Sequence, residues 1–139
     1  MKTILFLSTI VTLVFGSTVP ASAGPLGTYE ITVKGAYVDD DGSHPVRAKG
    51  TLKLTSVKGE FSVLNLSGKR GRGLLRFSKP VHPTATTQKI KGTVKDLNYD
   101  GKGTFTGKLV RSGSHYKITA EMRMTDSEGV MKGTITATK

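Results

Sequence analysis

Apolar and polar residues alternate along most of the chain after residue 27, and no stretch there repeats with a helical period. In the run 28–38, Tyr29, Ile31 and Val33 share one parity, whereas threonine, glutamate and lysine residues share the other. Residues of equal parity in a strand point to the same side of the sheet. A period of two with one polar face is typical of half-buried antiparallel strands, so the chain is constrained to an all-β fold.

Turn-forming residues divide the alternating region into short segments. Clusters of Asp, Gly, Ser and Lys separate the apolar runs, and several of these residues tolerate a positive φ. We predict eight strands, at residues 28–38, 46–56, 60–67, 74–79, 88–97, 103–111, 116–125 and 130–138. In the third strand, Phe61 and Val63 differ in parity from Leu64 and Leu66, which predicts a bulge.

Glycine recurs in the middle of strands, at positions whose parity places them on the apolar side. Because glycine weakens a flat strand, this recurrence indicates tight curvature, where neighbouring strands need room. The residues concerned are Gly35, Gly50, Gly92, Gly107 and Gly133. We therefore predict a small antiparallel β-barrel of about eight strands, with a two-sheet β-sandwich as the alternative. An unpaired edge at the first or last strand would offer a dimerisation surface.

The first 23 residues have the layout of a cleavable secretory signal peptide. Lys2 precedes an apolar run at residues 4–15, and Ala21-Ser22-Ala23 has the form of a signal-peptidase site. The apolar run is too short to span a hydrocarbon core of about 30 Å. We expect residues 24–139 to form a single all-β domain without a transmembrane anchor. The protein should be secreted or extracytoplasmic, either extracellular or, in a Gram-negative cell, periplasmic.

The predicted domain is strongly basic. Of the 21 lysines and arginines, one is Lys2, and the other 20 stand against 10 aspartates and glutamates. An excess of this size attracts anions, so the expected partners are an anionic polymer, a cell surface or an acidic protein. The chain contains no cysteine, which excludes disulfides, thiolate metal sites and a cysteine nucleophile.

No residue pattern points to catalysis. His44, His82 and His115 fall in predicted loops without the spacing of metal ligands. The acidic run 39–42 fails as an EF-hand loop, because Tyr37 occupies the first ligand position. The predicted interior offers only apolar, tyrosine and glycine residues. We therefore expect a protein that is not an enzyme, with no cofactor and no metal.

One stretch of the chain is free of acidic residues. Between Glu60 and Asp96 there is no carboxylate. The glycine-rich segment 68–73 matches no phosphate-binding loop, and two interpretations of it stay open: an anion-binding nest of backbone N–H groups, or a mobile cationic hairpin tip. If the strands 74–79 and 88–97 pair, their cations share one outer face with this loop at its edge. The predicted binding residues are Lys69, Arg70, Arg72, Arg76, Lys89, Lys91 and Lys95.

These observations predict a secreted, non-enzymatic binding module whose basic outer face recognises an anionic surface or an acidic macromolecule. Such a module would suit an effector or a host or cell-surface interaction protein. The chain has no tryptophan, and most phenylalanines and tyrosines have inward parity, which argues against sequence-specific nucleic-acid binding. The alternative function is an extracellular or periplasmic carrier, because an eight-stranded barrel can hold one small apolar ligand.

Overall fold

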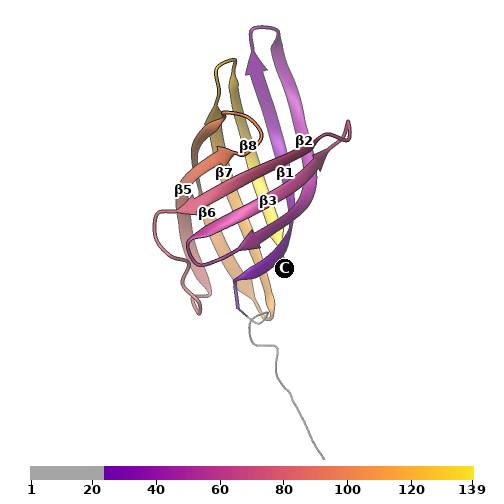
Figure 1. The fold of residues 1–139 in the computed structure, drawn as a ribbon. Coiled ribbons are helices and arrows are strands. Elements are labelled where there is room, and N and C mark those ends of the chain that lie inside the picture. Colours follow the sequence, from indigo (N-terminus) through magenta and orange to yellow (C-terminus); the bar gives the residue numbers. More distant parts are fainter. Residues whose placement is uncertain (1–23) are drawn as a thin grey trace, which may run out of the picture.

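Eight strands run up and down in sequence order, and each is hydrogen-bonded to the next (Figure 1). The structure, a computed structural model, describes residues 24–139, so the predicted signal peptide at residues 1–23 lies outside the described residues. The strands are β1 (Gly27–Asp39), β2 (Gly42–Leu54), β3 (Lys58–Asn65), β4 (Arg70–Phe77), β5 (Thr87–Asp96), β6 (Lys102–Ser112), β7 (His115–Thr125) and β8 (Val130–Thr138). The prediction of an antiparallel barrel is confirmed.

The barrel is closed by pairing of its first and last strands. The β1–β8 ladder extends from Glu30 opposite Thr138 to Val38 opposite Val130. Closure satisfies the backbone groups that an open sheet would leave exposed at its edges. The expected dimerisation edge at the first or last strand is therefore absent from residues 24–139, and the sandwich alternative is not formed.

Most of the segment 68–73 is neither the mobile hairpin tip nor the anion-binding loop that we considered, because it belongs to a strand. The positive-φ turn residue is Gly68, and β4 already begins at Arg70, four residues before its predicted start. Gly71 pairs with Val63, and Gly73 pairs with Phe61. Glycine and arginine alternate here with the strand period, with glycine inside and arginine outside. The glycines made this short strand resemble a turn.

The predicted bulge in the third strand is also wrong. The β2–β3 ladder is continuous from Ala48 opposite Asn65 to Leu54 opposite Gly59. The two leucines of the other parity are exposed to solvent, and no bulge turns them inward. Leu64 is 46% exposed, and Leu66, in the turn after β3, is 85% exposed. Two apolar side chains therefore lie on the outer surface at this end of the strand.

Inward side chains fill the middle of the barrel. Phe77 packs edge-on against Phe105, with the ring centroids 5.6 Å apart. The largest fully buried side chains are Tyr29, Phe105, Ile31, Leu52, Leu109, Ile118, Ile135 and Val94. No buried residue of the described chain is charged. Burial of this apolar surface is the main favourable contribution to folding.

Inward glycines lie where paired strands approach most closely. A Cβ atom on Gly92 would lie 1.7 Å from the carbonyl oxygen of Arg76, and one on Gly50 would lie 1.8 Å from that of Ser62. Any larger residue would have to push the neighbouring backbone away. The predicted reason for the recurring glycines, tight curvature between neighbouring strands, is therefore confirmed.

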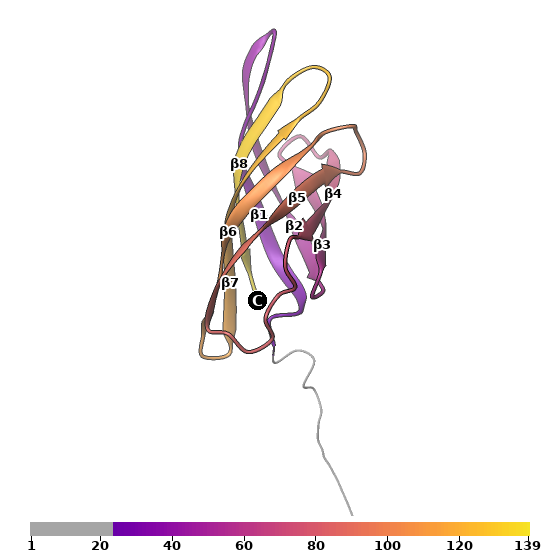
Figure 2. The ribbon, with the colours of Figure 1, turned by 90° about the vertical axis from the view of Figure 1, so that its left-hand side faces the viewer.

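The lower end of the barrel is covered by the segment 24–26, which lies beside the C-terminal end of β8 (Figure 2). The Nζ atom of Lys139 donates hydrogen bonds to the carbonyl oxygens of Gly24 and Leu26. It lies 5.8 Å and 5.6 Å from the ring centroids of Tyr29 and Tyr116. Burial lowers the pKa of Lys139. A cation held over two aromatic rings stabilises this end.

The glycine contacts lead to a test of stability. We expect Gly92→Ala to lower the free energy of unfolding by about 3 kcal/mol, because its Cβ would overlap the Arg76 carbonyl group. Gly71→Ala is the matched control: it is also an inward glycine, but its Cβ would lie 3.5 Å from Val63 Cγ2, an ordinary contact. Its effect should stay within about 1 kcal/mol. Urea unfolding followed by circular dichroism measures both, and equal losses would contradict this explanation.

Candidate functional site

The predicted basic face lies on two neighbouring strands. β4 and β5 pair, with Leu74 opposite Lys95 and Arg76 opposite Thr93. Six of the seven predicted cations occupy exposed outward positions of these strands: Arg70, Arg72, Arg76, Lys89, Lys91 and Lys95. Lys69 lies apart from them, in the turn before β4, where it lines a hollow at the upper end of the barrel.

The strands on either side extend this face. On β6, Lys102 lies opposite Lys95 and Lys108 lies opposite Lys89. We call the outward cations of β3 to β6 the basic wall: Lys58, Arg70, Arg72, Arg76, Lys89, Lys91, Lys95, Lys102 and Lys108. The cations of β3 and β6 were not among the predicted binding residues. Lys58 and Lys102 lay outside the predicted strands 60–67 and 103–111, and the proximity of Lys108 to β5 depends on the register.

The basic wall contains three pairs of like charges directly across the ladder. Lys58 faces Arg76, and the two lysine pairs between β5 and β6 were described above. No lysine or arginine of residues 24–139 forms an ion pair with a carboxylate; the ion pair that the described chain contains joins His44 and Asp39. Like charges directly opposite one another cost stability, so this wall carries an electrostatic cost that an anion would relieve.

A hollow of about 330 Å³ lies in the basic wall. Three cations surround it, Arg76, Lys95 and Lys102, together with the hydroxyl groups of Thr93 and Thr104. Lysine and arginine can only donate hydrogen bonds, and threonine can both donate and accept. This set of groups is suited to an oxyanion such as a sulfate, phosphate or carboxylate group, with a neutral hydroxyl-bearing group beside it.

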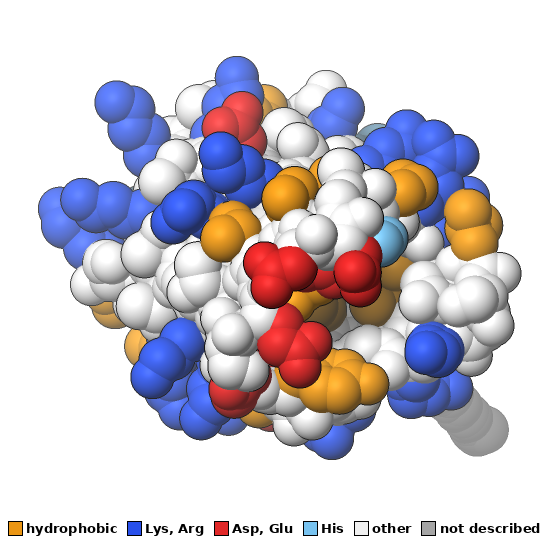
Figure 3. All heavy atoms as spheres, turned by 90° about the horizontal axis from the view of Figure 1, so that it is seen from above, with side chains coloured by type: hydrophobic (Ala, Val, Ile, Leu, Met, Phe, Trp, Pro, Cys, Tyr) orange, Lys and Arg blue, Asp and Glu red, His pale blue; other side chains and the backbone are white. Residues whose placement is uncertain are grey.

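The opposite charge gathers at the upper end of the barrel. Seen from above, acidic side chains surround an apolar centre, and most of the basic side chains lie further out (Figure 3). Seven of the ten acidic residues lie in or beside the turns at this end: Asp39, Asp40, Asp41, Asp96, Asp100, Asp126 and Glu128. We call this end the acidic mouth. The wall is thereby left almost free of acidic neighbours.

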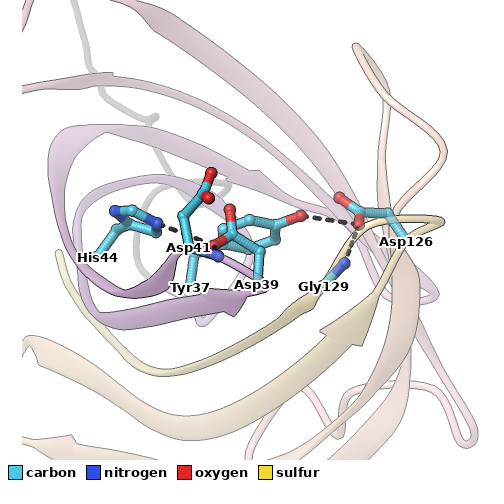
Figure 4. A network of polar contacts seen from close by, with 6 residues as sticks. All are labelled: Tyr37, Asp39, Asp41, His44, Asp126 and Gly129. Atoms are coloured by element: carbon cyan, nitrogen blue, oxygen red, sulfur yellow. Dashed lines mark hydrogen bonds and ion pairs between the residues drawn. The ribbon is translucent and has the colours of Figure 1, made fainter.

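Carboxylates of the acidic mouth mainly hold its turns. The hydroxyl group of Tyr37 donates to Asp126 Oδ1 over 2.9 Å, and the N–H group of Gly129 donates to the same oxygen (Figure 4). The N–H group of Glu128 also donates to it. These hydrogen bonds lower the pKa of Asp126. Burial and the bond to Asp126 raise the pKa of Tyr37 to about 12. On β1, Asp39 Oδ1 lies 3.0 Å from Nε2 of His44.

The acidic mouth encloses a hollow of about 810 Å³. Its inner lining is apolar and includes Tyr37, Val46, Met124 and Met131. Below these residues the interior is filled by side chains, so the hollow ends near the mouth.

The histidines do not assemble into a metal centre. His44 and His115 lie at strand ends and not in loops as predicted. His82 is in a loop, where its Nδ1 atom accepts hydrogen bonds from the N–H groups of Thr84 and Ala85. Within residues 24–139, no three histidine, aspartate or glutamate side chains are grouped as metal ligands.

No helix in the described part of the chain is long and apolar enough to cross a bilayer. Comparison of the chain with protein-family models, curated proteins and solved structures gave no match.

The acidic mouth gives a pH-dependent prediction. Because its folded-state pKa lies below the ordinary 3.8, ionised Asp126 contributes stability that is present above about pH 4 and is lost as pH falls through the folded-state pKa. We expect Asp126→Asn to lower the melting temperature at pH 7, and the difference from the unmodified protein to shrink below pH 4. Asp100→Asn is the control, since Asp100 makes no hydrogen bond in the described structure. A difference independent of pH would contradict this account.

Proposed function

We propose that the protein is an exported, non-enzymatic binding module whose basic wall binds an anionic polymer or another acidic macromolecular surface. One observation carries the proposal: the wall places like charges directly opposite one another on three cross-strand pairs, and none of these cations forms an ion pair with a carboxylate. Those cations remain available to an external anion.

Solubility alone would not explain this arrangement. A soluble surface is best served by charges of both signs that are interspersed, because large fields of one sign repel internally. Here the two signs are partly separated: seven of the ten carboxylates lie in the acidic mouth, and nine of the 20 lysines and arginines of residues 24–139 lie on the wall. A field of one sign steers oppositely charged partners and raises their rate of association.

The chemistry of the basic wall favours recognition of charged substituents over recognition of nucleic-acid bases. Proteins that bind single-stranded nucleic acids stack bases on exposed aromatic rings. Among residues 24–139, Tyr99 is the aromatic residue with a strongly exposed side chain, and its exposed fraction is 71%. Tyr99 lines the hollow of the acidic mouth and is not part of the wall. The wall itself offers ammonium, guanidinium and hydroxyl groups.

A carrier function is the second candidate, and the hollow in the acidic mouth is the observation that favours it. Its apolar lining could contact a small ligand. Another hollow, of about 1030 Å³, lies at the lower end of the barrel and is lined in part by Tyr29, Val110 and Tyr116. Native mass spectrometry of the protein purified from its own source tests this candidate. A bound small molecule would support it, and a uniformly unliganded mass would count against it.

The main proposal predicts strong, salt-dependent retention on immobilised heparin. We expect Arg76→Ser, Lys95→Ser and Lys102→Ser together to lower the eluting salt concentration and to reduce the slope of log affinity against log salt by about one per lost contact. The matched control is the triple variant at Arg47, Lys49 and Lys53 of β2, which removes the same charge outside the basic wall.

The triple variant at Lys69, Arg70 and Arg72 should weaken retention less than the Arg76, Lys95 and Lys102 variant, because Lys69 lies at the acidic mouth. Elution of the unmodified protein below about 0.2 M NaCl would contradict the proposed function, since polyanion binding through several cations persists above that range. Equal losses in the wall variant and the β2 control would show that net charge alone is responsible.

A further inference from the structure

Cross-strand pairing brings six outward residues into one continuous row. We call this row the cross-strand track: Lys58, Arg76, Thr93, Thr104, Arg123 and Lys132, one residue from each strand from β3 to β8. Each is the direct ladder partner of the next. Because paired strands are about 4.8 Å apart, the row extends about 24 Å over the surface. Two cations lie at each end, with two hydroxyl groups between them.

Two hollows lie along the cross-strand track and meet at Thr104. The hollow of about 330 Å³ in the basic wall includes Arg76, Thr93 and Thr104. A second hollow, of about 670 Å³, includes Thr104, Arg123 and Lys132. The track therefore passes through recessed surface on both sides of β6. Arg123 and Lys132 were not among the predicted binding residues, because they are distant in sequence from the acid-free interval.

The surroundings of the cross-strand track define its limits. Its continuation onto β1 and β2 is uncharged, with Ala36 opposite Lys132 and Pro45 opposite Ala36. Glu121 lines the second hollow and is the carboxylate nearest to the track on β7. It forms no ion pair with either cation there, and its ladder partners are Thr106 and Thr134. On β3, Glu60 lies two residues from Lys58 on the same face, and it too forms no ion pair. Neither cation pair is therefore held in an ion pair with a carboxylate.

We infer that the cross-strand track binds a single chain of an anionic glycan that runs across the strands; this inference rests on the proposed function and specifies its ligand. Arginine at positions 76 and 123 can hold sulfate or carboxylate groups by two parallel hydrogen bonds. The adjacent Lys58 and Lys132 add charge, and the two threonines can donate to and accept from sugar hydroxyl groups.

The course of the cross-strand track disfavours nucleic acids. It follows the curved wall across six of the eight strands, whereas duplex DNA has a persistence length of about 50 nm and resists such bending. Single-stranded nucleic acid is flexible enough, but its binding sites depend on stacking with aromatic side chains. The track contains none. A glycan with acidic substituents is flexible enough to follow the curved wall, and its binding does not require stacking on aromatic side chains.

Size-defined heparin oligosaccharides test this inference by calorimetry. Affinity should rise with oligosaccharide length until both cation pairs are occupied, and then change little. We expect R123S/K132S to remove the gain made by long oligosaccharides, a loss of roughly tenfold, while short ones bind as before. The matched control R47S/K49S removes one arginine and one lysine from exposed positions of β2 and leaves the track intact. This control variant should lose clearly less affinity for the long oligosaccharides than R123S/K132S does.

A second variant tests the track without changing the charge. Thr104→Val removes the hydroxyl group at the point where the two hollows meet. It should weaken binding of the long oligosaccharides and leave the salt slope unchanged. Circular dichroism melting of every variant checks that the barrel is folded.

The outcomes separate the inference from the proposed function. If the unmodified protein fails to bind heparin, the proposed function fails as well. If it binds, but R123S/K132S and R47S/K49S lose affinity equally, the cross-strand track is wrong and the basic wall remains. If single-stranded or duplex DNA binds as tightly as the long oligosaccharides and is weakened equally by R123S/K132S, the ligand is a nucleic acid and the glycan assignment is overturned.

Discussion

The close approach of paired backbones at the inward glycines is the contact on which this barrel depends. At Gly50 and Gly92 the neighbouring carbonyl oxygen occupies the space that a Cβ atom would need. This lets the sheet bend tightly enough for eight short strands to close around a core of their own side chains. Closure in turn fixes the register of every ladder, and the register decides which outward cations become neighbours. The packing inside and the charge pattern outside therefore have one origin.

Much of this arrangement could be predicted from parity alone. Alternation identified eight strands and assigned Arg76, Lys91 and Lys95 correctly to the outer face. The strand prediction failed at residues 71–73, because glycine occurs both in curved strands and in turns. These glycines belong to a strand, although glycine beside charged residues is also typical of turns. The partners of Arg76 on β3 and β5 depend on loop lengths and ladder register, which no single segment encodes. The acidic mouth was not predicted, although alternate turns of an up-and-down barrel share one end.

The two ends of the barrel are stabilised by different interactions. At the lower end, Lys139 holds the segment 24–26 over buried Tyr29 and Tyr116, and the core continues to that end. At the acidic mouth, turn carboxylates accept backbone hydrogen bonds and leave an apolar hollow open. Rigid turns at one end and a pinned segment at the other keep the strands between them in register.

The separation of charge along the molecule has a further consequence for its orientation. With most carboxylates at one end and the cations distributed over the sides of the barrel, the protein has an electric dipole as well as a net charge. Near a polyanionic surface, such a dipole turns the molecule before contact is made. The wall is drawn inward, and the acidic mouth is pushed outward into solvent. A barrel bound in this way would present the same end to its surroundings every time, with the hollow of the acidic mouth facing away from the polymer.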